Sequence, residues 1–78
     1  MYYVYALQSL KDKQLYIGIS ADPKTRLESH NSGMAQSTKG RRPFKLFYVE
    51  KCENRQKARC REKYLKSGVG REFLKTKL

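Results

Sequence analysis

The chain has 78 residues, with 18 Lys and Arg against 7 Asp and Glu, and a formal net charge of +11. A chain this short suits one small domain, so we expect residues 1–78 to fold as a single unit. Its two cysteines suit neither a disulfide framework nor a zinc site, and no apolar run approaches the ~20 residues of a membrane span. With no signal-peptide pattern at the start, these features predict a cytoplasmic protein. Basic residues spread over a folded domain indicate a polyanionic partner, most often nucleic acid.

The first twenty residues predict a β-hairpin. YYVYAL (2–7) and QLYIGIS (14–20) are rich in strand-forming residues, and the LKDK between them is a turn signal. With a two-residue turn, Tyr5 and Tyr16 share one face, and Gly18 lies opposite Tyr5. A glycine inside a strand indicates that something approaches the backbone closely. We therefore expect a close approach to the backbone at Gly18, beside the ring of Tyr5.

The next segment predicts a helix with well-marked ends. Asp22 is the expected N-cap, a proline follows it, and Gly33 is the expected terminator. Leu27 is the expected main contact with the core. Arg26 and His30 are four residues apart and therefore lie on the same face of the helix.

The second half of the chain predicts one strand and two helices. FKLFYVEKC (44–52) is the third strand and follows an irregular, basic loop. NRQKARCREKYLKSG (54–68) is a helix capped by Asn54, and GREFLKTKL (70–78) is a short third helix.

Glu62 is the most unusual residue of the second helix. Ala58 and Leu65 mark the apolar stripe of this helix, and Glu62 falls between them on the face that should point inward. A buried carboxylate is costly unless it is paired or binds a metal. The ordinary alternative is an ion pair with Arg59 or Lys66 on the same helix, and a strand tyrosine is likewise more often packing than catalysis.

Five segments carry a resemblance to a known family. They are YVY (3–5), YIG (16–18), RLESHNSG (26–33), TKGRRP (38–43) and AxxxExxLK (58–66). In this order they resemble the GIY-YIG nucleases, above all the small stand-alone bacterial members. The resemblance covers nearly the whole chain. It implies an α+β fold, with a three-stranded antiparallel sheet flanked by helices in the order β-β-α-β-α-α, and metal-dependent hydrolysis of phosphodiester bonds.

By position, the resemblance makes Tyr5, Tyr16, Arg26, His30 and Glu62 the catalytic residues. Glu62 would bind Mg²⁺ or Mn²⁺, with water and substrate phosphate completing the shell. Arg26 would hold the scissile phosphate. Tyr16 would take a proton from water, its pKa lowered by the metal, Arg26 and the positive field of the domain. Tyr5 and His30 would orient Tyr16 or the water, or His30 would take the proton itself.

The chain departs from the family pattern at three places. Tyr3 stands where the first motif has a glycine, and Ile19 follows YIG where several members have a basic residue. The asparagine that several members carry near the C-terminus is missing, because no Asn lies beyond Asn54. Activity could be weak, or other cations, such as Lys39, Arg41 or Lys66, could substitute.

Further cations are predicted to grip the backbone of a nucleic acid, with DNA as the expected substrate. They are Lys39, Arg41, Arg42, Lys45 and Lys66, together with the basic faces of the second and third helices. Backbone contacts position a duplex without reading its sequence. We therefore expect low sequence specificity or recognition of structured DNA, and repair or recombination as the family-level setting.

Three other functions fit parts of this pattern. A non-catalytic nucleic-acid-binding module would keep the fold and bind in a salt-sensitive way without cutting. A subunit whose partner protein supplies targeting or activity would suit a chain this small, in which we expect no separate targeting domain. A purely structural basic protein explains the charge but leaves Tyr16, Arg26 and Glu62 as coincidences.

Overall fold

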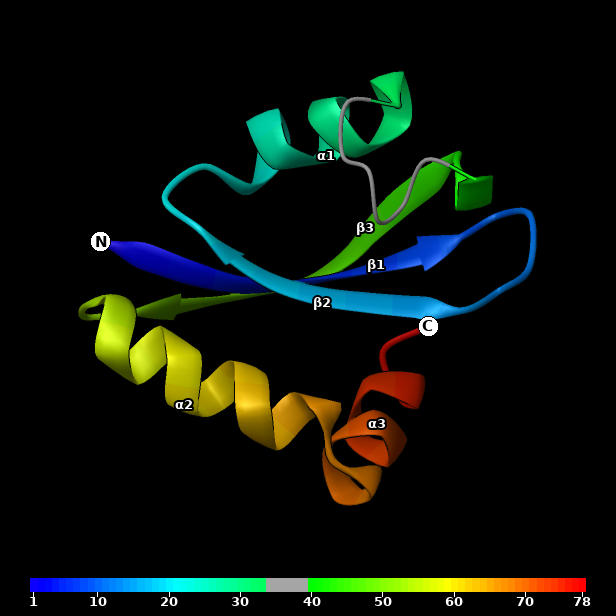
Figure 1. Ribbon diagram of the computed structural model, residues 1–78. Coiled ribbons are helices and arrows are strands. Elements are labelled where there is room, and N and C mark those ends of the chain that lie inside the picture. Colours follow the sequence, from blue (N-terminus) through cyan, green and yellow to red (C-terminus); the bar gives the residue numbers. More distant parts are fainter. Residues whose placement is uncertain (34–39) are drawn as a thin grey trace.

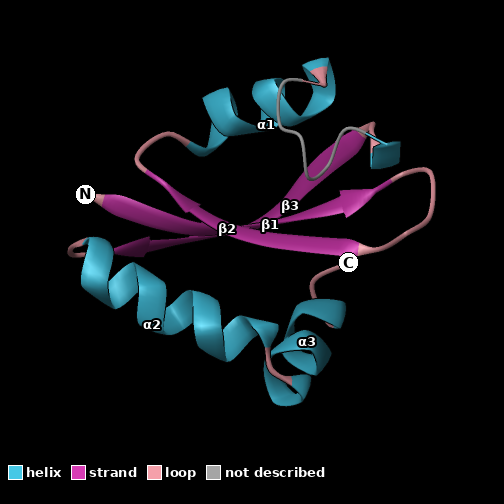
Figure 2. Ribbon diagram, viewed as in Figure 1, coloured by secondary structure: helices cyan, strands magenta, loops and turns pink. Residues whose placement is uncertain are grey.

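The computed structural model describes residues 1–33 and 40–78 and has the predicted α+β architecture. Its antiparallel sheet has the order β2-β1-β3, with strands β1 (Tyr2–Ser9), β2 (Leu15–Ser20) and β3 (Phe44–Cys52). Helix α1 (Pro23–Ser32) lies on one face of the sheet, and α2 (Arg55–Lys66) and α3 (Gly68–Lys75) lie on the other (Figures 1 and 2). Among the described residues, no helix has the length and apolar character needed to cross a bilayer.

The hairpin has the predicted register although its connection is longer than two residues. Residues 10–14 lie between the two strands. Tyr5 pairs with Gly18, and Leu7 pairs with Tyr16. Odd positions of β1 therefore still face even positions of β2, and the two tyrosines share the face of the sheet that α1 covers.

Local capping groups set the helix ends where the sequence predicted them. Asp22 and Asn54 accept backbone hydrogen bonds at the starts of α1 and α2, and Gly33 ends α1 with a left-handed φ of 83°. The third helix differs at both ends from the predicted range and ends at Lys75 rather than at residue 78. Because Ser67 ends α2 and also caps α3, the third helix begins at Gly68 rather than two residues later.

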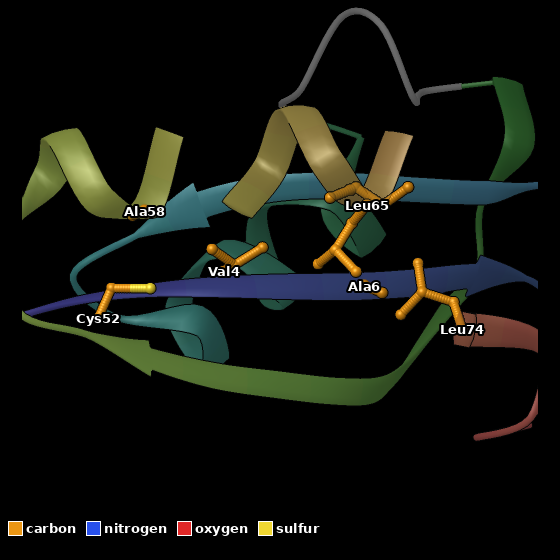
Figure 3. Packing of buried hydrophobic residues seen from close by; sticks show 7 residues of the cluster. Val4, Ala6, Cys52, Ala58, Leu65 and Leu74 are labelled. Carbon is orange, nitrogen blue, oxygen red and sulfur yellow. The ribbon is translucent and has the colours of Figure 1, made fainter. Parts of the chain in front are cut away.

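The larger hydrophobic core lies between the sheet and the α2–α3 pair. Val4 and Ala6 of β1 are fully buried there against Leu65 and Leu74, with Ala58 and other small or apolar residues around them (Figure 3). Because Ala58 and Leu65 are buried against the sheet, the orientation of α2 about its axis is set, and so is the direction that each of its flanks faces.

A second core fills the face under α1, and here one prediction was wrong. Tyr5, Leu7 and Phe44 are buried on this face. We expected Leu27 to be the main helical contact, but Leu27 is only partly buried, and His30 is the buried residue of α1. The rings of Tyr5, Tyr16 and Phe44 lie around His30, so a polar aromatic residue takes the central position of α1.

One flank of α2 is tied to β3 by a polar network. The Arg61 guanidinium donates two hydrogen bonds to the Glu50 carboxylate, at 2.7 and 3.0 Å, and the Tyr48 hydroxyl donates a third at 2.6 Å. Arg61 also lies over the Tyr64 ring, 4.8 Å from its centroid. The opposite flank of α2, which carries Glu62, therefore faces away from β3.

Candidate active site

The absence of a side chain at Gly18 is required by Tyr5. A Cβ placed at Gly18 would lie 2.7 Å from the Tyr5 Oη and 2.8 Å from its Cζ, and 3.2 Å from Cε1 of Tyr16. Contacts below 3.0 Å are essentially never tolerated by a real Cβ. The phenol of Tyr5 thus lies directly over the backbone of β2, beside the ring of Tyr16, with the two ring centroids 6.4 Å apart.

His30 is held against these two rings by the C-terminal turn of α1. The side-chain amide of the next residue, Asn31, accepts from the Phe44 N–H at 2.6 Å and donates to its carbonyl oxygen at 3.1 Å. This pairing fastens α1 to the start of β3 and leaves His30 with no exposed surface. The centroid of its ring lies 4.7 Å from that of the Tyr16 ring, in an edge-to-face arrangement. Its Nε2 lies 3.4 Å from the Tyr5 hydroxyl oxygen.

Burial and nearby charges set the ionisation of the inner pair. Burial lowers the pKa of His30, and the nearby Arg26 guanidinium lowers it further, so the imidazole is neutral at pH 7. Burial raises the pKa of Tyr5, and the charges of Tyr16 and Glu62 add to this, while Arg26 acts in the opposite direction. Tyr5 and His30 are therefore neutral, hydrogen-bonding partners inside the site.

Arg26 and Glu62 come to this cluster from opposite faces of the sheet. Arg26 is exposed on α1, and Glu62 projects from α2 with 20% of its side chain exposed. Both act on the same phenol, that of Tyr5. In the structure Glu62 pairs with Lys66 at 3.3 Å, which is one of the two ion pairs that its spacing allowed. The other four predicted catalytic residues thus all lie close enough to Tyr5 to contact it or to influence its ionisation.

The donors present suit a metal ion only when the substrate supplies part of its shell. Among residues 1–33 and 40–78, no group of three or more His, Cys, Asp or Glu side chains could hold a metal. Glu62 offers one partly exposed carboxylate. Mg²⁺ commonly binds one or two carboxylates and completes its shell with water and substrate phosphate. Glu62 fits this arrangement, and it does not fit a preformed all-protein cage.

The predicted nucleic-acid contacts that the structure describes have different neighbours. Lys39 lies outside the described residues. Arg41 pairs with Asp12 at 3.3 Å, and the Arg42 guanidinium lies against Gly33, where an added Cβ would collide with it. Lys45 pairs in register with Gln8 on β1. Lys66 lies beside a predicted catalytic residue, Glu62.

Two cations beside Glu62 were not named individually as nucleic-acid contacts from the sequence, where Arg59 was considered only as an ion-pair partner of Glu62. Arg59 and Lys63 line a depression of about 340 Å³ on α2, together with Glu62, Lys66 and Cys60. The signal was present in the spacing, since residues three, four or seven apart lie along one flank of a helix. It was hidden by the many other basic residues of the same helix.

Fold and sequence together identify the class of protein. Residues 1–75 match the model of the GIY-YIG catalytic domain. The chain therefore belongs to the GIY-YIG family, a nuclease superfamily whose members generally depend on divalent metals and act on nucleic acid.

Its relatives are small proteins named UPF0213. The chain is 45% identical to UPF0213 protein CPE1444 of Clostridium perfringens over 67 residues, which are 85% of this chain and 71% of the relative. It is 36% identical to UPF0213 protein SH2523 of Staphylococcus haemolyticus, over 95% of this chain and 90% of that protein. The solution NMR structure of UPF0213 protein BH0048 from Bacillus halodurans is similar, with a TM-score of 0.57 and 34% identity, over 97% of this chain and 84% of that one. The matched segment spans as little as 56% of another relative, a UPF0213 protein of Syntrophus aciditrophicus.

Proposed function

We propose that this chain is a metal-dependent endonuclease that hydrolyses phosphodiester bonds of DNA with low sequence specificity or with selectivity for structured DNA. One observation carries the proposal. A phenol, an exposed guanidinium and a carboxylate converge on the edge strand β2, around a glycine that has no room for a side chain. A merely structural basic protein has no need of this combination.

Of the two candidates for the general base, His30 and Tyr16, the difference in exposure favours Tyr16. His30 has no exposed surface, is already engaged with Tyr5 and is held neutral by burial. Tyr16 is partly exposed, so its hydroxyl can meet a water molecule. We therefore assign to Tyr16 the removal of the proton from the attacking water, a role worth about 10²–10⁴-fold in rate. His30 and Tyr5 position the Tyr16 ring by contact.

Two residues would provide the positive charge that stabilises the phosphate: Arg26 directly, and Glu62 through the metal ion that it would hold. The Arg26 guanidinium is permanently charged and exposed, so it can bind two phosphate oxygens. Glu62 would hold the Mg²⁺ or Mn²⁺ ion. Such an ion stabilises the developing charge and the leaving oxygen. Lys66 must give up its ion pair when Glu62 takes this role, which leaves a cation free beside the substrate.

The test is nicking of supercoiled plasmid at low salt with Mg²⁺, with Mn²⁺ and with EDTA. Wild type should nick only with metal, and Tyr16→Phe and Glu62→Gln should each lose at least about 10²-fold in rate. Tyr64→Phe and Glu72→Gln are matched controls on exposed surface and should retain activity. Nicking that persists in EDTA, or equally in all four variants, would contradict the proposal.

The Glu62–Lys66 ion pair supports a second candidate, a binding module without catalysis. An engaged carboxylate and an apolar Ile19 after YIG are what a site that has lost its chemistry would retain. This candidate predicts salt-sensitive binding of DNA with no nicking in either metal, and the plasmid assay separates the two.

A further inference from the structure

The two flanks of α2 differ in what their cations contact. On the flank facing β3, Arg61 is bound to Glu50, and Lys57 pairs with Glu53 at 3.1 Å. On the other flank, Arg59 and Lys63 form no ion pair with any other residue that the structure describes. Both of these cations facing β3 are therefore paired, whereas on the other flank Lys66 pairs with Glu62, and Arg59 and Lys63 form no ion pair with a described residue.

The flank of α2 that carries Arg59, Lys63 and Lys66 also carries the candidate catalytic carboxylate, Glu62. Arg59, Lys63 and Lys66 line the depression of about 340 Å³ that also contains Glu62. At ~1.5 Å rise per residue, the distance from Arg59 to Lys66 is about 10 Å along the helix. One strand of DNA presents a phosphate every ~3.4 Å along its axis, so this length matches about three phosphates.

The position of this flank relative to the sheet completes the surface. Helix α2 packs against β1 and β2, and β2 is the edge strand of the sheet. Figure 1 shows β2 between α1 on one side and α2 on the other. A backbone lying along the α2 flank therefore passes the edge of β2, where Tyr16 stands, and can reach the exposed Arg26 of α1.

We infer that the α2 flank formed by Arg59, Lys63 and Lys66 is the track that binds the DNA backbone and delivers a phosphate to Glu62. This inference rests on the proposed function and names the surface on which it acts. The basic segment 40–45 is secondary, because Arg41 is occupied by Asp12 and Arg42 lies against the end of α1.

The first test is the salt dependence of binding to a labelled duplex in EDTA, where no cutting occurs. Neutralising one phosphate contact lowers the slope of log K against log[salt] by about 0.9. The Arg59→Gln/Lys63→Gln variant should therefore have a slope shallower by almost 2. Lys51→Gln/Lys57→Gln removes the same charge from other exposed surface and should lower the slope by less than half as much. Equal slopes for the two double variants would overturn the inference.

The second test uses the chain's own cysteines. Cys60 is exposed and lines the same depression, whereas Cys52 is buried. Saturating duplex should slow the reaction of Cys60 with N-ethylmaleimide severalfold in wild type. An unchanged rate at saturation would overturn the inference, since the backbone would then lie elsewhere.

The outcomes separate this inference from the proposed function. Suppose that wild type nicks plasmid, that duplex does not protect Cys60, and that the two double variants have equal salt slopes. The nuclease proposal would then stand, and the inference about the α2 flank would be wrong. A wild-type protein that binds neither duplex nor branched DNA, or that binds only RNA, overturns both.

Discussion

Replacing Gly18 with alanine perturbs the contact on which the candidate site is built. The new methyl group would lie 2.7 Å from the Tyr5 hydroxyl oxygen and 2.8 Å from Cζ. Tyr5 cannot swing out to relieve this contact, because only 1% of it is exposed and it packs in the core under α1. The strand or the ring must shift, and the Tyr5–His30 contact shifts with it.

The expected cost follows from two opposing effects. Overpacking of a well-packed site typically costs about 1–3 kcal/mol. Alanine recovers about 0.5–1 kcal/mol of backbone entropy relative to glycine. The free energy of unfolding should therefore fall by about 1–2 kcal/mol, which in a domain of this size lowers the melting temperature by about 5–15 °C.

Thermal and urea unfolding followed by circular dichroism measure this change. Gly68→Ala is the matched control, because a Cβ at Gly68 meets nothing within 4 Å and the residue begins a helix. The control should leave stability unchanged or raise it slightly. A Gly18→Ala protein as stable as the control would refute the placement of the Tyr5 phenol over β2.

Two further predictions concern the buried polar groups. Tyr5→Phe removes the hydroxyl that contacts His30 and should cost about 0.5–1.5 kcal/mol in urea unfolding, whereas Tyr64→Phe, an exposed change, should not. Burial raises the pKa of Glu50, but hydrogen bonds from Arg61 and Tyr48 outweigh it and hold that pKa below its usual 4.5. The Glu50 contribution to stability is thus complete above about pH 4.5 and is lost as the pH falls through the lower, folded pKa. Melting temperatures measured from pH 6 to pH 3 should fall more steeply for wild type than for Glu50→Gln, and parallel curves would contradict the assignment.

The fold was predictable because its boundaries are set by local chemistry. Asp22 and Asn54 cap helices through bonds to backbone atoms three residues away, and the sequence alone reveals such pairs. The bounds of β3 follow from its run of strand-forming residues, and the pairing of Tyr5 with Gly18 follows from alternation along the two strands of the hairpin. The start of α3 was missed because Ser67 serves two helices at once.

The burial of site residues was less predictable because it depends on contacts between distant segments. His30 is buried because Asn31 fastens the end of α1 to Phe44, a contact that no local pattern announces. For the same reason Arg41 and Arg42 looked like free cations, although the fold gives both of them neighbours.

The charge of this chain is best understood by asking which cations the fold uses. A net charge of +11 on 78 residues opposes compaction through self-repulsion, so unpaired cations gathered in one place need a compensating partner. Arg61 has that partner in Glu50, inside the protein. Arg59 and Lys63 have none among the described residues, and they flank the carboxylate that the proposed chemistry requires. A polyanion lying along α2 would supply the missing countercharge at the place where a phosphate must arrive, so the charge imbalance and the candidate site have one common explanation.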